Sequence, residues 1–201
     1  MSQIIRLFPS RLNLNGDQAN ALVLQKRAQW AGVEIDVVDY EDVITLAPLM
    51  KILEDSDAST MLILGHGSLA AMSSIAHLKA DLQKLLAYAK QRGQTVLTVG
   101  SSTEWLLEHS VRERESNFWQ GSITYEGENF DVIGYLNSRA QLAPVHVDAS
   151  LIYVLLHGPV LAKSEKLADH LVAKLTGRNV QFERREQLAG FVEEAIKTAQ
   201  G

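Results

Sequence analysis

Val96-Leu97-Thr98-Val99-Gly100-Ser101-Ser102-Thr103-Glu104-Trp105-Leu106 is the stretch of this chain from which its fold class follows. The apolar and β-branched residues of the first half predict a buried strand, and the residues after the glycine predict a helix. A strand that turns this sharply into a helix is typical of a nucleophile elbow, in which a tight backbone lifts one side chain into an active site. At the apex of this turn stands Gly100, which has no side chain to offer.

Short apolar runs and amphipathic stretches alternate along the rest of the chain, which is the pattern of a mostly parallel sheet flanked by helices. We therefore predict an α/β fold, built as a single domain over residues 1–201 and including a small antiparallel excursion. Asp17 is a candidate N-cap of the first helix. The predicted strands cover residues 4–8, 33–38, 61–64, 95–99 and 151–156, the antiparallel pair covers 122–125 and 132–136, and the helices cover 17–31, 78–90, 164–175 and 185–198.

The composition is typical of a globular protein, with 46% hydrophobic and 21% charged residues. The net charge of −5 argues against nucleic acid as a partner, because the phosphate backbone attracts clustered Lys and Arg. The absence of cysteine excludes disulfides, thiolate metal sites and a cysteine nucleophile. The His, Asp and Glu residues show no metal-ligand spacing, so we expect no metal site.

Two further features concern the location of the protein in the cell. No apolar run approaches the roughly 18 residues that would suggest a membrane span. Residues 1–5 lack the charged and then apolar pattern of a signal peptide. We therefore expect a cytoplasmic protein without a membrane span.

Three separated segments resemble those of a known family: residues 12–20 (LNLNGDQAN) with 26–28 (KRA), residues 62–68 (LILGHGS) with the elbow after them, and residues 155–163 (LLHGPVLAK) with 167–169 (LAD). Together they resemble the class I glutamine amidotransferase domains of the cobyric acid synthase-like group, nearest to the glutaminase subunits of lipid II isoglutaminyl synthases. This resemblance implies a flavodoxin-like α/β fold, no cofactor, and a synthase or Mur-ligase-like protein as partner.

In that family a cysteine thiolate attacks the side-chain amide of glutamine, a histidine moves the proton, and backbone N–H groups hold the oxyanion. By resemblance, Gly100 falls on the cysteine and His157 falls on the catalytic histidine. Ser101 and Ser102 replace the two glycines that usually follow the cysteine, and Glu104 stands where a glutamine is usual.

Other positions that the resemblance places around the substrate have also changed. The loop Gly65-His66-Gly67-Ser68 keeps two glycines of a turn that is usually all glycine and serves the oxyanion. Asn137 matches an asparagine at the end of a family strand, whereas Gln141 stands where an arginine helps to seat the substrate. Each histidine has two interpretations: a pocket residue or a loop residue for His66, and a general base or a packing residue for His157.

Three functions are compatible with these residues. The leading hypothesis is an amidotransferase-like protein that has lost the glutaminase reaction and acts as a binding or regulatory subunit of a synthase. The second is an active amidase or glutaminase that uses Ser101 or Ser102 with His157, although an apex at Ser101 would put the β-branched Val99 and Thr103 in crowded turn positions. The third is a protein that binds glutamine or another small molecule at the carboxyl ends of the strands, where open α/β sheets bind ligands.

Overall fold

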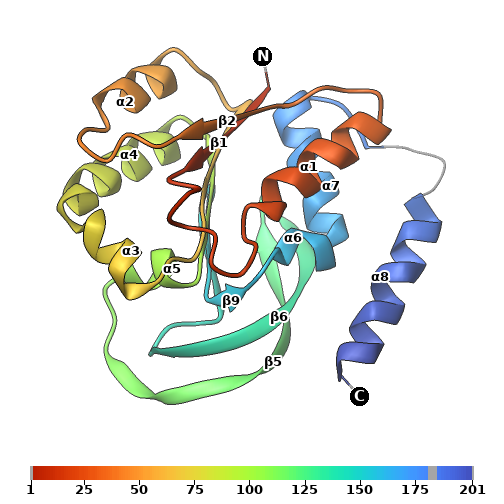
Figure 1. The fold of residues 1–201 in the computed structure, drawn as a ribbon. Coiled ribbons are helices and arrows are strands. Elements are labelled where there is room, and N and C mark those ends of the chain that lie inside the picture. The colour runs from red at the N-terminus through yellow and green to blue at the C-terminus, as the bar shows by residue number, and fades with distance from the viewer. Residues whose placement is uncertain (1, 181–184, 201) are drawn as a thin grey trace.

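The computed structural model describes residues 2–180 and 185–200 and has an α/β fold built on a six-stranded sheet (Figure 1). The strands of this sheet are β1 (Gln3–Leu7), β2 (Asp36–Tyr40), β3 (Thr60–Leu64), β4 (Thr95–Val99), β7 (Val145–Asp148) and β8 (Leu151–Val154). They follow the order β2-β1-β3-β4-β8-β7, and every neighbouring pair runs parallel except β7 with β8. The predicted α/β class with a mostly parallel sheet is therefore confirmed.

The burial of each strand explains how well the apolar pattern located it. Every residue of β3 and of β4 is buried, and continuous apolar runs are typical of strands that are covered on both faces. The strand expected at residues 33–38 is found later, at Asp36–Tyr40. This strand lies at the edge of the sheet, where half-exposed residues weaken the apolar signal.

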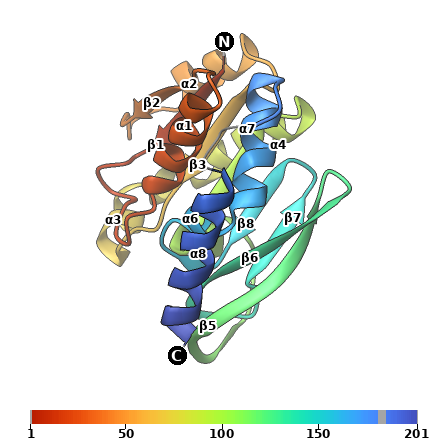
Figure 2. The ribbon, with the colours of Figure 1, turned by 90° about the vertical axis from the view of Figure 1, so that its right-hand side faces the viewer.

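Helices cover the sheet in two groups. They are α1 (Ala19–Trp30), α2 (Ala47–Glu54), α3 (Leu69–Ser74), the 3-10 turn η1 (Ala76–Leu78), α4 (Lys79–Gln91), α5 (Ser101–Leu106), α6 (Val160–Lys163), α7 (Glu165–Thr176) and α8 (Arg185–Gln200). The apolar residues of α1, α6 and α7 form one core cluster, and those of α2, α4 and α5 form another on the opposite face of the sheet (Figure 1). The predicted helix at 185–198 is confirmed as α8, which lies at the outside of the molecule (Figure 2).

A second sheet is antiparallel and is larger than the small excursion that the sequence predicted. It consists of β5 (Val111–Tyr125), β6 (Glu128–Ala140) and β9 (Leu156–His157), in the order β5-β6-β9. The apolar pattern indicated only the end of the hairpin, because the first part of β5 alternates Arg and Glu. The predicted strand at 151–156 divides between β8 and β9, and the second part carries His157 into this sheet.

Asp17 is not the N-cap of α1, so that prediction was wrong. The helix begins at Ala19 without a side-chain cap. Asp17 is fully buried, and its carboxylate accepts a hydrogen bond from the backbone N–H of His66 at 3.1 Å. A buried backbone N–H without a partner costs free energy, so the carboxylate of Asp17 binds the N–H of His66 and does not cap the helix.

Of the helices in the described part of the chain, none is long and apolar enough to span a membrane. The predicted single domain of residues 1–201 also takes in residues 1, 181–184 and 201, which lie outside the described residues. The two sheets meet at the carboxyl ends of the parallel strands, where the hairpin of β5 and β6 crosses below the sheet (Figure 1). The candidate site lies there.

Candidate functional site

The elbow predicted around Gly100 is present. β4 ends at Val99, Gly100 has φ 57° and ψ −120°, and α5 begins at Ser101. A residue with a Cβ adopts such a conformation only with strain, so glycine suits the apex. The N–H of Gly100 donates to the carbonyl oxygen of Val154 at 2.7 Å, and this bond fixes the turn to β8.

The imidazole of His66 occupies the space above the apex. A Cβ on Gly100 would lie 2.4 Å from Nδ1 of His66 and 3.0 Å from its Cγ, which is closer than real Cβ atoms come to other atoms. Nδ1 also accepts a hydrogen bond from the backbone N–H of Ser101 at 2.9 Å. The N–H of the residue after the apex is the donor that an elbow uses in its oxyanion hole. In this chain the ring of His66 fills the space that the side chain of a nucleophile would occupy. It also binds the N–H of Ser101, which would be one of the oxyanion donors.

The charge state of His66 agrees with this contact. Burial of the ring, together with the neighbouring His157, lowers the pKa of His66 below its ordinary value, although Asp17 and Glu104 oppose the shift. A neutral imidazole keeps a lone pair on Nδ1, which is what the N–H of Ser101 needs. The neutral ring is therefore the form that fits above Gly100.

This lowered pKa predicts a loss of stability in mild acid. The unfolded chain binds a proton at His66 at a higher pH than the folded chain does, so the stabilisation is complete above the ordinary histidine pKa and is lost as the pH falls toward the folded one. The free energy of unfolding, measured in urea at about pH 7.5 and about pH 5.5 on either side of the ordinary value, should fall more for the wild type than for His66→Gln. Equal falls in the two proteins would contradict the prediction.

His157 lies beside His66 and has both ring nitrogens engaged. The two rings are 4.5 Å apart between centroids and meet edge to face at 66°. Nε2 of His157 lies 3.2 Å from the carbonyl oxygen of Asn137, which can only accept, so Nε2 carries the proton. Nδ1 then accepts from the side-chain amide of Asn15 at 2.5 Å. With this pairing the ring has no free lone pair for taking a proton from a nucleophile.

The two serines after the apex bind the elbow to the loop at residues 65–67. The hydroxyl of Ser101 donates to the carbonyl oxygen of Gly67 at 3.0 Å and accepts from the N–H of Gly67 at 2.9 Å. The hydroxyl of Ser102 is fully buried and donates to the carbonyl oxygen of Gly65 at 2.6 Å. Each hydroxyl has a single proton, and in both serines that proton is already given to a backbone carbonyl.

The glycines of the loop are required by the close approach of another segment. A Cβ on Gly65 would lie 2.1 Å from the carbonyl oxygen of Leu12, and a Cβ on Gly67 would lie 2.7 Å from Cδ2 of the same residue. Ser68, the last residue of the predicted ligand loop, is exposed and caps α3 by accepting from the N–H of Ala71 at 3.2 Å. The loop therefore fits its own neighbours closely.

The segment at residues 12–20 connects the two histidine loops. Besides the bond from Asn15 to His157 and from His66 to Asp17, the N–H of Leu14 donates to the carbonyl oxygen of His66 at 2.9 Å. Asn20 is fully buried, and its Oδ1 accepts from the N–H of Leu161 at 3.0 Å, just beyond His157. The segment is a motif in the sequence, but no local pattern assigns Asn15 to the site.

Asn137 and Gln141, the predicted substrate-binding residues, are placed differently. Asn137 lies at the site, where its backbone contacts His157 and its side-chain Oδ1 accepts from Nη1 of Arg114 at 2.8 Å. Gln141 is exposed and binds Ser110 at the start of the hairpin through its backbone N–H (2.9 Å) and its Oε1 (2.7 Å). The structure brings Gly100, His66, His157 and Asn137 together, whereas Gln141 holds the base of the hairpin closed.

Glu104 and Arg114 are two charged residues near the site for which the sequence predicts no role there. The carboxylate of Glu104 on α5 accepts a hydrogen bond from the hydroxyl of Ser138 on β6. Arg114 reaches Asn137 from β5. Both contacts join residues that are more than twenty positions apart, and local sequence patterns carry no signal for such pairs.

A hollow of about 180 Å3, open to solvent, lies near the carboxyl ends of β1 and β3 and is lined by Arg6, Leu7, Pro9, Leu12, Gln18, Ile63 and Gly65. Only about 10 Å3 of this space admits a water-sized molecule, which is room for about one water. The guanidinium of Arg6 is already paired with the carboxylate of Asp39, through bonds of 2.7 and 2.9 Å. Over residues 2–180 and 185–200, no group of three or more His, Asp or Glu side chains is arranged to hold a metal ion.

Comparison with protein-family models and with curated protein sequences finds no match for this chain. The geometry itself defines an α/β protein with an elbow whose apex is a glycine covered by a neutral histidine.

Proposed function

We propose that this chain is a glutamine amidotransferase-like protein that does not hydrolyse glutamine and acts as a binding or regulatory subunit of a synthase, of Mur-ligase-like type. One observation carries the proposal: the ring of His66 lies where a nucleophile's side chain would be and binds the N–H of Ser101. An acyl-transfer site needs both the nucleophile and that donor. Both are taken up by the same side chain.

The residues at positions 66 and 100 fit each other, and together they support the loss of activity. The resemblance places cysteine at 100 and glycine at 66, whereas this chain has glycine at 100 and histidine at 66. The imidazole fits because Gly100 has no Cβ, since a Cβ there would meet Nδ1 at 2.4 Å. The exchange preserves packing in the elbow while removing the reacting group, as expected for a scaffold that is kept for binding.

The alternative enzyme, with a serine nucleophile, has less support. Ser101 and Ser102 donate their protons to the carbonyl oxygens of Gly67 and Gly65, and His157 is engaged on both ring nitrogens. A serine nucleophile needs a base that accepts its proton. Whichever serine acted would have to leave its bond to the carbonyl oxygen, and His157 would have to free a ring nitrogen, before such a pair could form.

The proposal is tested on the protein isolated from its own cells with its partners attached. Ammonia release from glutamine should equal that of a His157→Ala variant isolated in the same way. A synthase should co-purify with both, and its activity with ammonia should fall when the chain is removed and return when either form is added back. Ammonia release that is lost in the variant would contradict the proposal, as would a synthase indifferent to the chain.

A Gly100→Cys variant tests whether restoring the thiol alone restores glutamine hydrolysis. We expect no efficient glutamine hydrolysis from this single change, because the new Cβ would lie 2.4 Å from Nδ1 of His66, so the thiol and the imidazole compete for the same space. The double variant Gly100→Cys with His66→Gly is the matched comparison, since it restores both the thiol and the donor. Efficient hydrolysis by the single variant would show that the site has not been lost as proposed.

A further inference from the structure

The dipeptide Asn15-Gly16 lies at the candidate site, and it is the one place in the chain where glycine follows asparagine. It belongs to the irregular segment between β1 and α1, which descends to β9 in Figure 1, and both of its residues are exposed. The side-chain nitrogen Nδ2 of Asn15 lies 2.5 Å from Nδ1 of His157. A side-chain amide that is open to solvent therefore faces the histidine of the site.

An asparagine that precedes glycine can lose its side-chain amide without an enzyme. The main-chain nitrogen of the glycine attacks the side-chain carbonyl carbon of the asparagine and closes a cyclic imide, a succinimide. Glycine favours this step because no Cβ shields its nitrogen and because its backbone adopts many conformations. Regular secondary structure opposes the step, since the nitrogen there gives its proton to a main-chain carbonyl.

The structure leaves this reaction open at Gly16. Its φ of 74° is a conformation that glycine adopts without strain. Its N–H donates to the carbonyl oxygen of Asn13 at 3.3 Å, beyond the range of about 2.7–3.2 Å that is usual for N–H···O bonds. The other six asparagines all precede residues with a Cβ, which are Leu14, Ala21, Phe118, Phe130, Ser138 and Val180.

We propose that Asn15 is a self-modifying site, which in the folded protein loses its amide as ammonia and becomes aspartate or isoaspartate. A bond forms between the main-chain nitrogen of Gly16 and Cγ of Asn15, and the bond from Cγ to Nδ2 breaks. The nitrogen of Gly16 gives its proton to solvent, and Nδ2 takes up a proton as it leaves. Water then adds to one carbonyl of the succinimide, opens the ring and leaves a carboxylate.

The aspartate product reverses the hydrogen bond to His157. The amide nitrogen of Asn15 donates to Nδ1 of the ring, whereas a carboxylate only accepts. Nε2 of His157 already gives its proton to the carbonyl oxygen of Asn137. With a carboxylate beside Nδ1, the ring therefore carries a proton on both nitrogens and is a cation. The modification changes the charge of the histidine that faces the neutral ring of His66.

The isoaspartate product acts on the main chain, because it lengthens the chain between positions 15 and 16 by one methylene. The segment that it lengthens binds His66 on both sides of the dipeptide. The N–H of Leu14 donates to the carbonyl oxygen of His66 at 2.9 Å, and the carboxylate of Asp17 accepts from its N–H at 3.1 Å. We expect the longer segment to loosen these bonds. Each product thus alters the site, and neither recovers the amide.

Peptide mapping of the folded protein after incubation at neutral pH tests the modification. Trypsin releases residues 12–26, and fragmentation of that peptide in a mass spectrometer distinguishes Asn15 from Asn13 and Asn20. Asn15 should lose its amide while the other asparagines keep theirs. A sample digested without incubation gives the contribution of the digestion itself. Retention of the amide at Asn15 in the folded protein, or equal loss at Asn13, would overturn the proposal.

Two glycine variants form a matched pair. A Cβ at Gly16 would meet nothing within 4 Å, so Gly16→Ala shields the attacking nitrogen without a clash and should abolish most of the conversion. Gly32 has nearly the same φ, of 72°, and equally open surroundings, so Gly32→Ala carries similar backbone strain elsewhere and should convert like the wild type. Conversion of Gly16→Ala at the wild-type rate would contradict the attack by the nitrogen at position 16.

Asn15→Asp reproduces the aspartate product and tests its effect on the ring. Nitrogen NMR at neutral pH should show both ring nitrogens of His157 protonated in the variant and only Nε2 protonated in the wild type. Identical ring signals in the two proteins would rule out the change of charge. The modification releases one ammonia per chain, whereas glutamine hydrolysis would turn over, so its failure and that of the proposed function are separate results.

Discussion

Gly100→Ala should destabilise the protein by about 2–5 kcal/mol, one of the two largest effects that we expect from a single substitution. Two physical terms add. The backbone at φ 57° and ψ −120° is strained for any residue with a Cβ. The new Cβ would also lie 2.4 Å from Nδ1 of His66, so the imidazole would have to move and leave the N–H of Ser101 without its acceptor.

A control and a second variant separate these two terms. Gly93 also has a positive φ, of 67°, but a Cβ there would meet nothing within 4 Å, so Gly93→Ala measures backbone strain without a clash. His66→Gly removes the obstruction, and glycine is needed because even Cβ of His66 would lie 3.1 Å from the new atom. In urea unfolding, Gly100→Ala should cost about 1–3 kcal/mol less in the His66→Gly background than in the wild type. Independent, additive effects of the two substitutions would disprove the coupling.

The main sheet and the elbow were open to prediction because their signals are local. The strand at 95–99 is rich in apolar and β-branched residues because both its faces are covered, and the glycine after it marks the turn. The long hairpin was underestimated because the first part of β5 pairs with β6 only at Val111 and Glu115, and the Arg and Glu side chains of residues 112–115 give no apolar pattern. Its length follows from contacts between distant segments, which composition does not record.

The state of the candidate site depended on one contact of that kind. The resemblance places Gly100 at the position of a nucleophile, yet nothing in the sequence places His66, 34 positions earlier, above it. Asp17 shows the same limit: next to the start of a helix it has the pattern of an N-cap, but its carboxylate binds the N–H of His66. In both cases the decisive contact is with His66, in the loop at residues 65–67, and not with the local helix.

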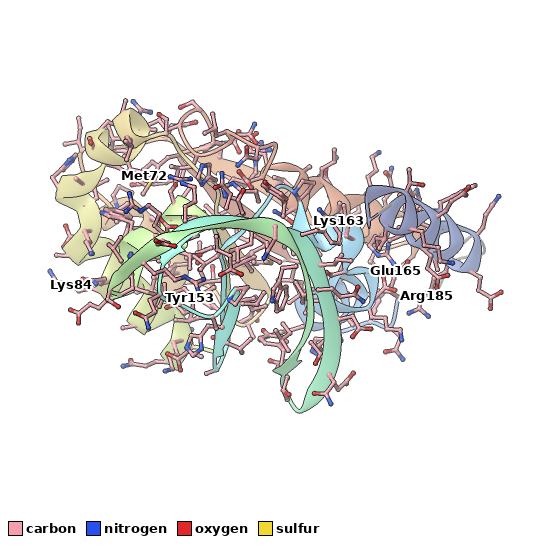
Figure 3. The ribbon with its side chains drawn as sticks, turned by 90° about the horizontal axis from the view of Figure 1, so that it is seen from below. Met72, Lys84, Tyr153, Lys163, Glu165 and Arg185 are labelled. Carbon is pink, nitrogen blue, oxygen red and sulfur yellow. The ribbon has the colours of Figure 1, made fainter. Side chains whose placement is uncertain are left out.

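Arg27→Met should destabilise the protein by about 3–5 kcal/mol, the loss expected when one partner of a buried ion pair is removed. Nε of Arg27 on α1 lies 2.6 Å from Oδ1 of Asp169 on α7, and the two side chains are 4% and 8% exposed. Arg185, at the start of α8, binds the other oxygen of Asp169 at 2.8 Å but is 42% exposed, so it compensates only in part. Glu165 and Arg185 lie close to each other at this end of the molecule (Figure 3).

Two comparisons distinguish burial of charge from loss of packing. Lys84→Met removes the exposed pair with Asp81 and should change stability by less than about 1 kcal/mol. Arg27→Met combined with Asp169→Leu removes the carboxylate of Asp169 together with its buried partner, so it should be less destabilising than Arg27→Met alone. Glu165, whose Oε2 lies 3.7 Å from Nη2 of Arg27, loses its partner equally in both variants. Arg27 and Asp169 belong to the first and third segments of the family resemblance. If the double variant were as unstable as the sum of its parts, these segments would be joined by packing and not by the ion pair.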